Sequence, residues 1–159
     1  MDTCVAAPCS TSVESLSQTE TPATEIPVAR RILLAEDNPQ DVFLLTEAFL
    51  AERISVEIDC VVDGDQLLAR LTGLTGDGRE SYGLVLLDLH LPRRSAEDVL
   101  IALNQQQRRL GMPLVVLTTL ISNQEQGRLL SLGVSEIITK PCDLDEYYSL
   151  AKKLSSLLV

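Results

Sequence analysis

Apolar residues gather in five short runs along the chain, and segments with a helical period separate these runs. The runs lie at 32–35, 55–62, 84–89, 113–117 and 134–138. In the third run, five of the six residues from Leu84 to Leu89 are apolar, which is typical of a strand buried on both faces. In the second run, apolar and acidic residues alternate, with Val56, Ile58 and Cys60 on the side expected to be apolar.

Each segment between the runs shows apolar positions at helical spacing, often behind a capping residue. Asn38-Pro39 is a good start for a helix that continues to about Glu52. Three more starts pair a capping side chain with an acid three residues later: Ser95 with Asp98, Ser122 with Glu125, and Asp143 with Glu146. The core face predicted for the last helix consists of Leu144, Tyr148, Ala151, Leu154 and Leu158.

This order of strand and helix, repeated five times over about 125 residues, defines the fold class. Strict alternation with apolar strands predicts an α/β protein whose parallel sheet is covered by helices on both faces. Its crossovers are expected to be right-handed. Sites in such open sheets lie outside the carboxyl ends of the strands.

Polar residues end four of the five predicted strands. Glu36 and Asp37 follow the first strand, Asp88 ends the third, Thr118 the fourth and Lys140 the fifth. Parallel strands bring these ends to one edge, where three carboxylates would repel each other unless a cation lies among them. Oxygen ligands of this kind suit Mg²⁺. A carboxylate can also act as a nucleophile toward phosphorus, with a lysine and a hydroxyl contacting the phosphate oxygens.

Composition narrows the possible functions and partners. The net charge of −10 argues against a general nucleic-acid-binding surface. No apolar run approaches the roughly 20 residues that span a bilayer. The N-terminus lacks the pattern of a secretory signal, so we expect a cytoplasmic protein without a membrane partner. Residues 1–29 are rich in Ser, Thr, Pro, Glu and Ala and are predicted to form a disordered tail before a domain at 30–159.

Four motifs in this order resemble the receiver domain of two-component response regulators. They are Glu36-Asp37-Asn38-Pro39, LLDLHLP around Asp88, the VVLTT stretch that contains Thr118, and Thr139-Lys140-Pro141. The resemblance covers about residues 31–159. It implies a flavodoxin-like, doubly wound (βα)5 fold with a five-stranded parallel sheet in the strand order 2-1-3-4-5.

The resemblance also implies a role for each acidic residue. Asp88 is expected to be the phosphoacceptor. Asp37 would bind Mg²⁺, and Glu36 would do so directly or through water. The backbone carbonyl of His90 would be a further metal ligand. The domain would catalyse only its own phosphorylation and dephosphorylation, so it is expected to be a switch and not a turnover enzyme.

Further family positions fall on the last two strands and on the loop after Asp88. Thr118 corresponds to the switch hydroxyl and Lys140 to the lysine that pairs with phosphate, and the peptide bond from Lys140 to Pro141 is cis in the family. Ile137 stands at the aromatic switch position, and Ser95 stands where this loop commonly has glycine. Both departures leave open an alternative reading, a pseudo-receiver that binds partners without phosphorylation.

The same residues suggest partners and exclude two other classes of protein. The EDNPxD start and the LLDLHLPRR loop resemble single-domain regulators paired with phytochrome-type sensor histidine kinases. That likeness implies red-light signalling and a homodimer through the fourth helix, fifth strand and fifth helix. A haloacid-dehalogenase-like phosphatase would need a second aspartate where His90 stands, and a dinucleotide-binding protein would need a GxGxxG loop.

Overall fold

A computed structural model of the chain describes residues 30–73, 82–107 and 110–158. The predicted tail at 1–29 therefore lies outside the described residues. Five parallel strands form one sheet in the order β2-β1-β3-β4-β5, which confirms the predicted fold class and strand order. The strands are β1 (Arg30–Ala35), β2 (Val56–Val61), β3 (Leu84–Asp88), β4 (Leu114–Thr118) and β5 (Glu136–Thr139).

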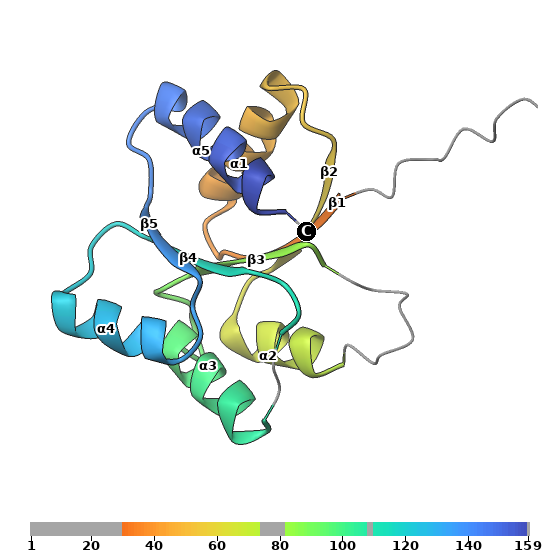
Figure 1. Ribbon diagram of the computed structural model, residues 1–159. Helices are drawn as coiled ribbons and strands as arrows, with labels where there is room; N and C mark the ends of the chain where they lie inside the picture. The colour runs from red at the N-terminus through yellow and green to blue at the C-terminus, as the bar shows by residue number, and fades with distance from the viewer. Residues whose placement is uncertain (1–29, 74–81, 108–109, 159) are drawn as a thin grey trace, which may run out of the picture.

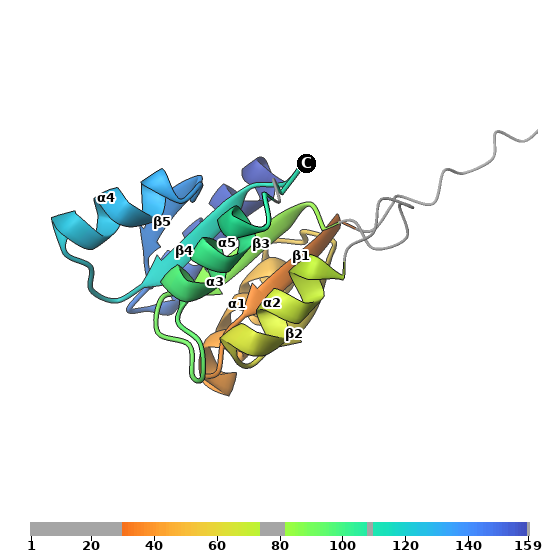
Figure 2. The same ribbon diagram turned by 90° about the horizontal axis from the view of Figure 1, so that it is seen from below.

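Helices cover both faces of the sheet, as parallel crossovers require (Figure 1). Helices α1 and α5 lie on one face, and α2, α3 and α4 lie on the other. The view from below looks onto the face of the sheet, with α2 and α3 in front of the strands and α1 and α5 behind them (Figure 2). The helices are α1 (Pro39–Ala51), α2 (Gly64–Thr72), α3 (Ala96–Gln105), α4 (Asn123–Ser131) and α5 (Leu144–Leu157).

The central strand β3 and its neighbour β4 are buried along their whole length. Alternate side chains of each strand enter different cores, because successive strand residues point to opposite faces. Leu84 and Leu86 pack toward α1 and α5, whereas Val85 and Leu87 pack toward α2, α3 and α4. Asp88, at the end of β3, is therefore fixed by two separate hydrophobic cores.

Two details of the predicted cores are wrong, and both concern the edges of the layers. In β2, an edge strand, Val61 is buried whereas Cys60 is exposed. In α5, Leu144 is 45% exposed, and Tyr147 is buried in its place with Ala151 and Leu154. Leu144 is the first residue of α5, beyond the part of the helix that packs on the sheet and α1.

The capping predictions are confirmed by side-chain bonds at each helix start. The side chains of Asn38, Ser95, Ser122 and Asp143 each accept a hydrogen bond from a backbone N–H of the first turn. At α4 the reciprocal bond from the Ser122 backbone to the Glu125 side chain completes a capping box. Such caps satisfy N–H groups that the helix leaves free, and they fix where the loops from the strands end.

The loop that follows Asp88 is held against the start of α2. Gly64 N donates a hydrogen bond to Pro92 O at 3.3 Å, and a Cβ at Gly64 would lie 2.0 Å from Arg94 O. The turn does not require glycine at Ser95, which is extended (φ −66°) as the N-cap of α3. The residue with a left-handed backbone is Arg93, with φ 64°. Gly64 therefore lets the loop after the predicted phosphoacceptor approach α2.

Replacing Gly64 by alanine is predicted to destabilise the fold by about 1–3 kcal/mol, because the loop backbone must move away from the new methyl group. Gly127→Ala is the matched control. Gly127 lies within α4 with open space around it, so this change is expected to stabilise by about 0.5–1 kcal/mol. Urea unfolding of both variants tests the contact. Equal stability of Gly64→Ala and the wild type would contradict it.

Candidate functional site

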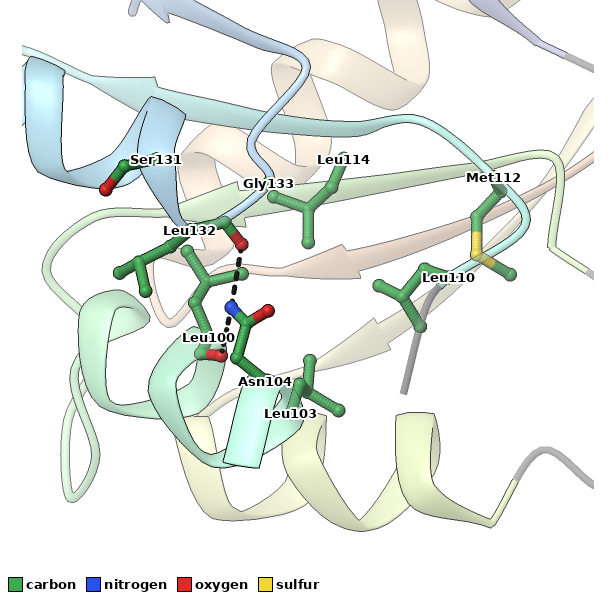
Figure 3. A pocket seen from close by; sticks show the side chains of 9 residues that line it. All are labelled: Leu100, Leu103, Asn104, Leu110, Met112, Leu114, Ser131, Leu132 and Gly133. Carbon is green, nitrogen blue, oxygen red and sulfur yellow. Dashed lines mark hydrogen bonds between the residues drawn. The ribbon is translucent and has the colours of Figure 1, made fainter. Parts of the chain in front are cut away.

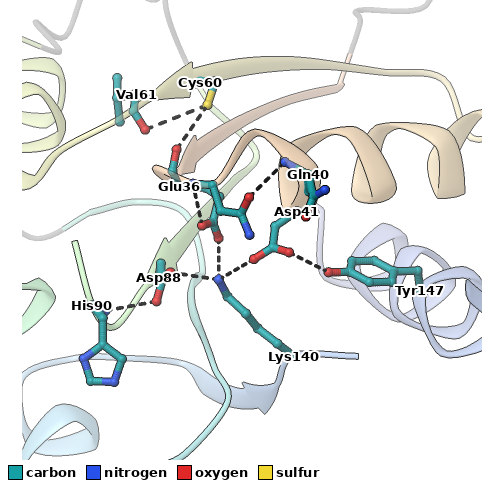
Figure 4. Close-up of polar contacts among 10 residues, drawn as sticks. Glu36, Gln40, Asp41, Cys60, Val61, Asp88, His90, Lys140 and Tyr147 are labelled. Carbon is teal, nitrogen blue, oxygen red and sulfur yellow. Dashed lines mark hydrogen bonds and ion pairs between the residues drawn. The ribbon is translucent and has the colours of Figure 1, made fainter. Parts of the chain in front are cut away.

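The sequence-predicted acids come together at the carboxyl edge of the sheet. Carboxylate oxygens of Glu36, Asp37 and Asp88 all lie within 4.8 Å of one another. Glu36 and Asp88 are buried, whereas Asp37 is exposed. Lys140 reaches the same place from the end of β5 (Figure 4). The edge of the sheet thus holds an acidic cluster with one side open to solvent.

Local folding at the end of β1 orients Glu36. Its backbone N–H continues the sheet by donating to Val61 O at 3.0 Å. Its Oε1 accepts a hydrogen bond from the backbone N–H of Asn38 at 3.1 Å, while the Asn38 side chain caps α1. The turn from β1 into α1 therefore holds Glu36 inward and leaves the next residue, Asp37, at the surface.

Asp88 occupies the last position of β3 and is only 7% exposed. Its Oδ1 accepts a hydrogen bond from the backbone N–H of His90 at 2.9 Å, and its Oδ2 accepts one from Lys140. The His90 imidazole is exposed and points away from Lys140 (Figure 4). The structure thus places the His90 backbone, rather than its ring, beside the Asp88 carboxylate.

Lys140 has an acceptor for each of its three ammonium hydrogens. Its Nζ lies 2.7 Å from Glu36 Oε2, 2.8 Å from Asp41 Oδ2 and 2.8 Å from Asp88 Oδ2. Burial alone lowers the pKa of Lys140, but the hydrogen bonds to Asp41, Asp88 and Glu36 outweigh it and the pKa is raised. Lys140 is therefore a fixed positive charge at the centre of the acidic cluster.

Too many carboxylates surround this single ammonium group for full neutralisation. Burial raises the pKa of Glu36, and the neighbouring charge of Asp88 raises it further, although bonds from Lys140 and Asn38 act in the opposite direction. Carboxylates in such a cluster favour a hard cation with oxygen ligands. Within the part of the chain that the structure describes, the carboxylates that could hold such a cation belong to Glu36, Asp37 and Asp88.

Sequence reasoning missed two residues of the site, Asp41 and Tyr147. Asp41 lies in the first turn of α1 and Tyr147 in α5, with the Tyr147 hydroxyl 3.4 Å from Asp41 Oδ1. Burial and the charge of Asp41 raise the pKa of Tyr147 to about 12. The third acid of the EDNPQD segment was the available signal for Asp41, because the first turn of α1 lies beside the end of β1.

Thr118 is buried at the end of β4, and its hydroxyl donates a hydrogen bond to Leu120 O at 2.8 Å. Its carbonyl accepts from the backbone N–H of Lys140 at 2.9 Å, which ties the ends of β4 and β5 together. The hydroxyl thus lies at the edge of the site, but it donates its hydrogen bond to the β4–α4 loop. Ile137 is half-buried and packs against the core under α3 and α4.

The expectation that the peptide bond between Lys140 and Pro141 is cis is wrong for this structure. No peptide bond of the described residues is cis, so this bond is trans. The difference is energetically small, because an X–Pro bond favours trans by only about 0.5–1 kcal/mol. Lys140 makes its three carboxylate contacts with the trans bond.

A cavity of about 350 Å³ lies between α3 and α4, at the end of β4 opposite Thr118 (Figure 3). Asn104 spans part of it by donating to Leu100 O at 3.0 Å and Leu132 O at 2.9 Å. Its described lining is apolar apart from Asn104 and Ser131, so it offers no charge for phosphoryl chemistry.

The helices of the described residues are all too short or too polar to cross a membrane.

Comparison with known proteins identifies the family. Residues 32–152 match the response regulator receiver domain family, and the chain belongs to it. The predicted resemblance is thereby confirmed. Receiver domains are signalling switches within two-component systems and generally not conventional enzymes, and the chain carries such a domain.

Several curated proteins are similar to the chain. The probable methanogenesis regulatory protein FilR2 of Methanothrix harundinacea is 34% identical over 115 residues, 72% of this chain and 74% of FilR2. Response regulator Rcp1 of Synechocystis is 30% identical over 129 residues, 79% of this chain and 86% of Rcp1. The chain spans only about half of other curated relatives, such as TcrA of Mycobacterium tuberculosis, of which it covers 46% at 34% identity.

Two solved structures resemble the chain in both fold and sequence. The phosphorylated cyanobacterial phytochrome response regulator RcpA superposes with a TM-score of 0.68 at 29% identity, covering 82% of this chain and 94% of RcpA. The Mn²⁺-bound form of Rcp1 superposes with a TM-score of 0.66 at 29% identity, covering 80% of this chain and 92% of Rcp1. Phytochrome-associated regulators are thus among the relatives, as the sequence predicted.

From the acidic cluster we predict how the free energy of unfolding responds to a divalent cation. Asp37→Asn removes an exposed charge from the cluster, so it should stabilise the protein in EDTA and weaken Mg²⁺ binding at least about tenfold. Urea unfolding in EDTA and across a Mg²⁺ titration measures both effects, because a ligand of the native state raises stability. The control is Glu47→Gln, an exposed acid of α1. A Mg²⁺ response equal to that of the wild type would contradict a role of Asp37 in binding.

Proposed function

We propose that this receiver domain accepts a phosphoryl group on Asp88 from the phosphohistidine of a sensor histidine kinase, in a Mg²⁺-dependent reaction. The observation that carries the proposal is the convergence on Asp88 of one ammonium group and two further carboxylates. A structural role would not need this charge density at a buried strand end. The phosphorylated relative RcpA supports the same chemistry here.

The metal ligands we propose are the carboxylates of Glu36, Asp37 and Asp88 and the backbone carbonyl of His90. The three carboxylates supply the hard oxygen donors that Mg²⁺ prefers, and the Mn²⁺-bound form of the relative Rcp1 supports a divalent cation at such a site. When bound, Mg²⁺ would neutralise charge on the phosphoryl oxygens. The solvent-exposed Asp37 leaves this side of the cluster accessible.

The proposed transfer uses Asp88 as the nucleophile. A carboxylate oxygen of Asp88 attacks phosphorus, the bond from phosphorus to the kinase histidine nitrogen breaks, and the imidazole leaves with that electron pair. Lys140 is already within 2.8 Å of Asp88 and can pair with a phosphoryl oxygen as charge moves onto Asp88. The aspartyl phosphate later returns to the carboxylate by hydrolysis.

Thr118 couples the new group to the neighbouring loop. Its single hydroxyl proton is donated to Leu120 O before phosphorylation. To donate to a phosphoryl oxygen instead, Thr118 must give up that bond, and the β4–α4 loop loses one of its attachments. The phosphoryl group carries about −1.5 to −2 charge units in place of the single negative charge of the free Asp88 carboxylate, which favours this exchange. Ile137 would then follow by an aliphatic change of rotamer.

The output we propose is protein contact through the surface made by α4, β5 and α5, as a homodimer. β5 is an edge strand of four residues, with α4 and α5 on either side of it (Figure 1). This surface carries the exposed Leu130 and the ion pair between Glu136 and Lys153. The relation to RcpA favours a phytochrome-type sensor kinase as the upstream partner.

The proposal is tested by the intact mass of the protein after incubation with acetyl phosphate, with and without Mg²⁺. The wild type should gain one phosphoryl group only with Mg²⁺, and Asp88→Asn should gain none because the nucleophile is missing. Asp145→Asn, an exposed acid of α5, is the matched control and should behave like the wild type. No gain in the wild type would favour the pseudo-receiver alternative.

Lys140→Ala should separate phosphoryl uptake from the response. The variant keeps the nucleophile and the metal carboxylates, so it should still gain a phosphoryl group, whereas its sedimentation coefficient should not change on phosphorylation as that of the wild type does. Lys152→Ala, at an exposed lysine of α5, is the control. A wild-type-like sedimentation change in Lys140→Ala would remove Lys140 from the response, and an unchanged wild type would contradict dimerisation as the output.

A further inference from the structure

We infer that Asp41 is a positioning residue for Lys140 and that Tyr147 carries the state of this lysine to α5. The inference rests on the proposed function and adds a hydrogen-bonded route to the rotamer change proposed for Ile137, whose side chain has no polar atom. Figure 4 shows the contacts in sequence, from Asp88 through Lys140 and Asp41 to Tyr147.

Lys140 cannot engage a phosphoryl oxygen without changing its present contacts. All three ammonium hydrogens already have carboxylate acceptors at 2.7–2.8 Å. A fourth acceptor must therefore displace one of them or share a hydrogen with it. On the inferred route the phosphoryl oxygen displaces one of these acceptors, so the ammonium group shifts when the aspartyl phosphate forms.

Asp41 differs from the other two acceptors of this lysine. Glu36 and Asp88 belong to the described carboxylate group that could hold a cation, and Asp41 stands outside that group. A bound cation would draw charge from Glu36 and Asp88, while Asp41 keeps its full attraction for the ammonium group. Asp41 thus holds Lys140 on the side of the site that faces α1 and α5.

The two oxygens of the Asp41 carboxylate have different partners. Oδ2 accepts from Lys140 at 2.8 Å, and Oδ1 lies 3.4 Å from the Tyr147 hydroxyl. A carboxylate is rigid and planar, so a shift of the lysine that turns or pulls Asp41 also changes its contact with Tyr147. This contact crosses from α1 to α5, which pack side by side on the same face of the sheet (Figure 1).

The surroundings of Tyr147 leave little room to absorb such a shift. Asp41, Lys140 and Tyr147 line a cavity of only about 10 Å³, which is at the lower limit for one water molecule. The ring itself is buried in the core with Leu45 and Leu150. A change at the hydroxyl is therefore expected to alter the ring environment and α5, which contributes to the proposed dimer surface.

The test is NMR of the full chain carrying tyrosine labelled with ¹³C at the ring ε positions. The chain has three tyrosines, so Tyr→Phe variants assign every resonance. With Mg²⁺ and excess acetyl phosphate, the Tyr147 resonance should shift, while that of Tyr82, which bonds to Asp59 near the far edge of the sheet, should stay. Intact mass of the same sample reports how much phosphoryl group is bound.

Substitution at Asp41 distinguishes a route through this carboxylate from a general change of α5. Asp41→Asn should still take up the phosphoryl group, because the nucleophile and cation ligands remain, but at least half of the Tyr147 shift should be lost. Tyr148→Phe, at the adjacent half-buried tyrosine, should keep the full shift. Lys140→Met offers a second test without phosphodonor: it should move the Tyr147 resonance relative to the wild type.

The outcomes separate the inference from the function on which it rests. A wild type that gains mass without a Tyr147 shift, or an Asp41→Asn variant with the full shift, overturns the inference alone. An unmoved Tyr147 resonance in Lys140→Met also overturns it. If the wild type gains no phosphoryl group, the proposed function fails, and the inference fails with it.

Discussion

The structure depends on one constraint, the balance of charge around Lys140. Its ammonium group bonds to three carboxylates, and Asp37 adds a fourth acid at the same sheet edge. One positive charge cannot neutralise four negative charges, so the cluster favours a further cation. The same lysine is the group best placed to meet an anionic phosphoryl group on Asp88. Because its negative charges are not fully neutralised, the site is suited to respond both to a cation and to a phosphoryl group.

The fold supplies the rigid support that this charge cluster needs. Parallel strands bring four loop starts to one edge, and the fully buried β3 and β4 fix Asp88 and Thr118 between two hydrophobic cores. The loop after Asp88 is held by the close approach of Gly64 to Arg94. Stable strands thus carry the reactive groups, whereas the loops and the side chains of Lys140 and Thr118 are left to exchange partners.

Sequence patterns predicted the elements and the family, because buried strands, caps and strand-end motifs leave strong local signals, and the strand order was implied by the resemblance to that family. They did not reveal Asp41 or Tyr147, whose importance arises from α1 and α5 packing together, a contact between residues about a hundred positions apart. Leu144 and Cys60 were placed inside by periodicity alone, but both lie where the sheet or a helix meets solvent. The cis bond before Pro141 was expected only from the resemblance to the family, and the bond is trans, the isomer that an X–Pro bond favours.

Borohydride trapping tests the central claim, that Asp88 itself carries the phosphoryl group, most directly. Borohydride reduces an acyl phosphate to an alcohol, so an aspartyl phosphate becomes homoserine, which peptide mass spectrometry can locate. After incubation with Mg²⁺ and acetyl phosphate, the account predicts homoserine at position 88 and at no other aspartate. Homoserine at Asp37 or Asp41, or unmodified Asp88 in protein that has gained a phosphoryl group, would contradict it.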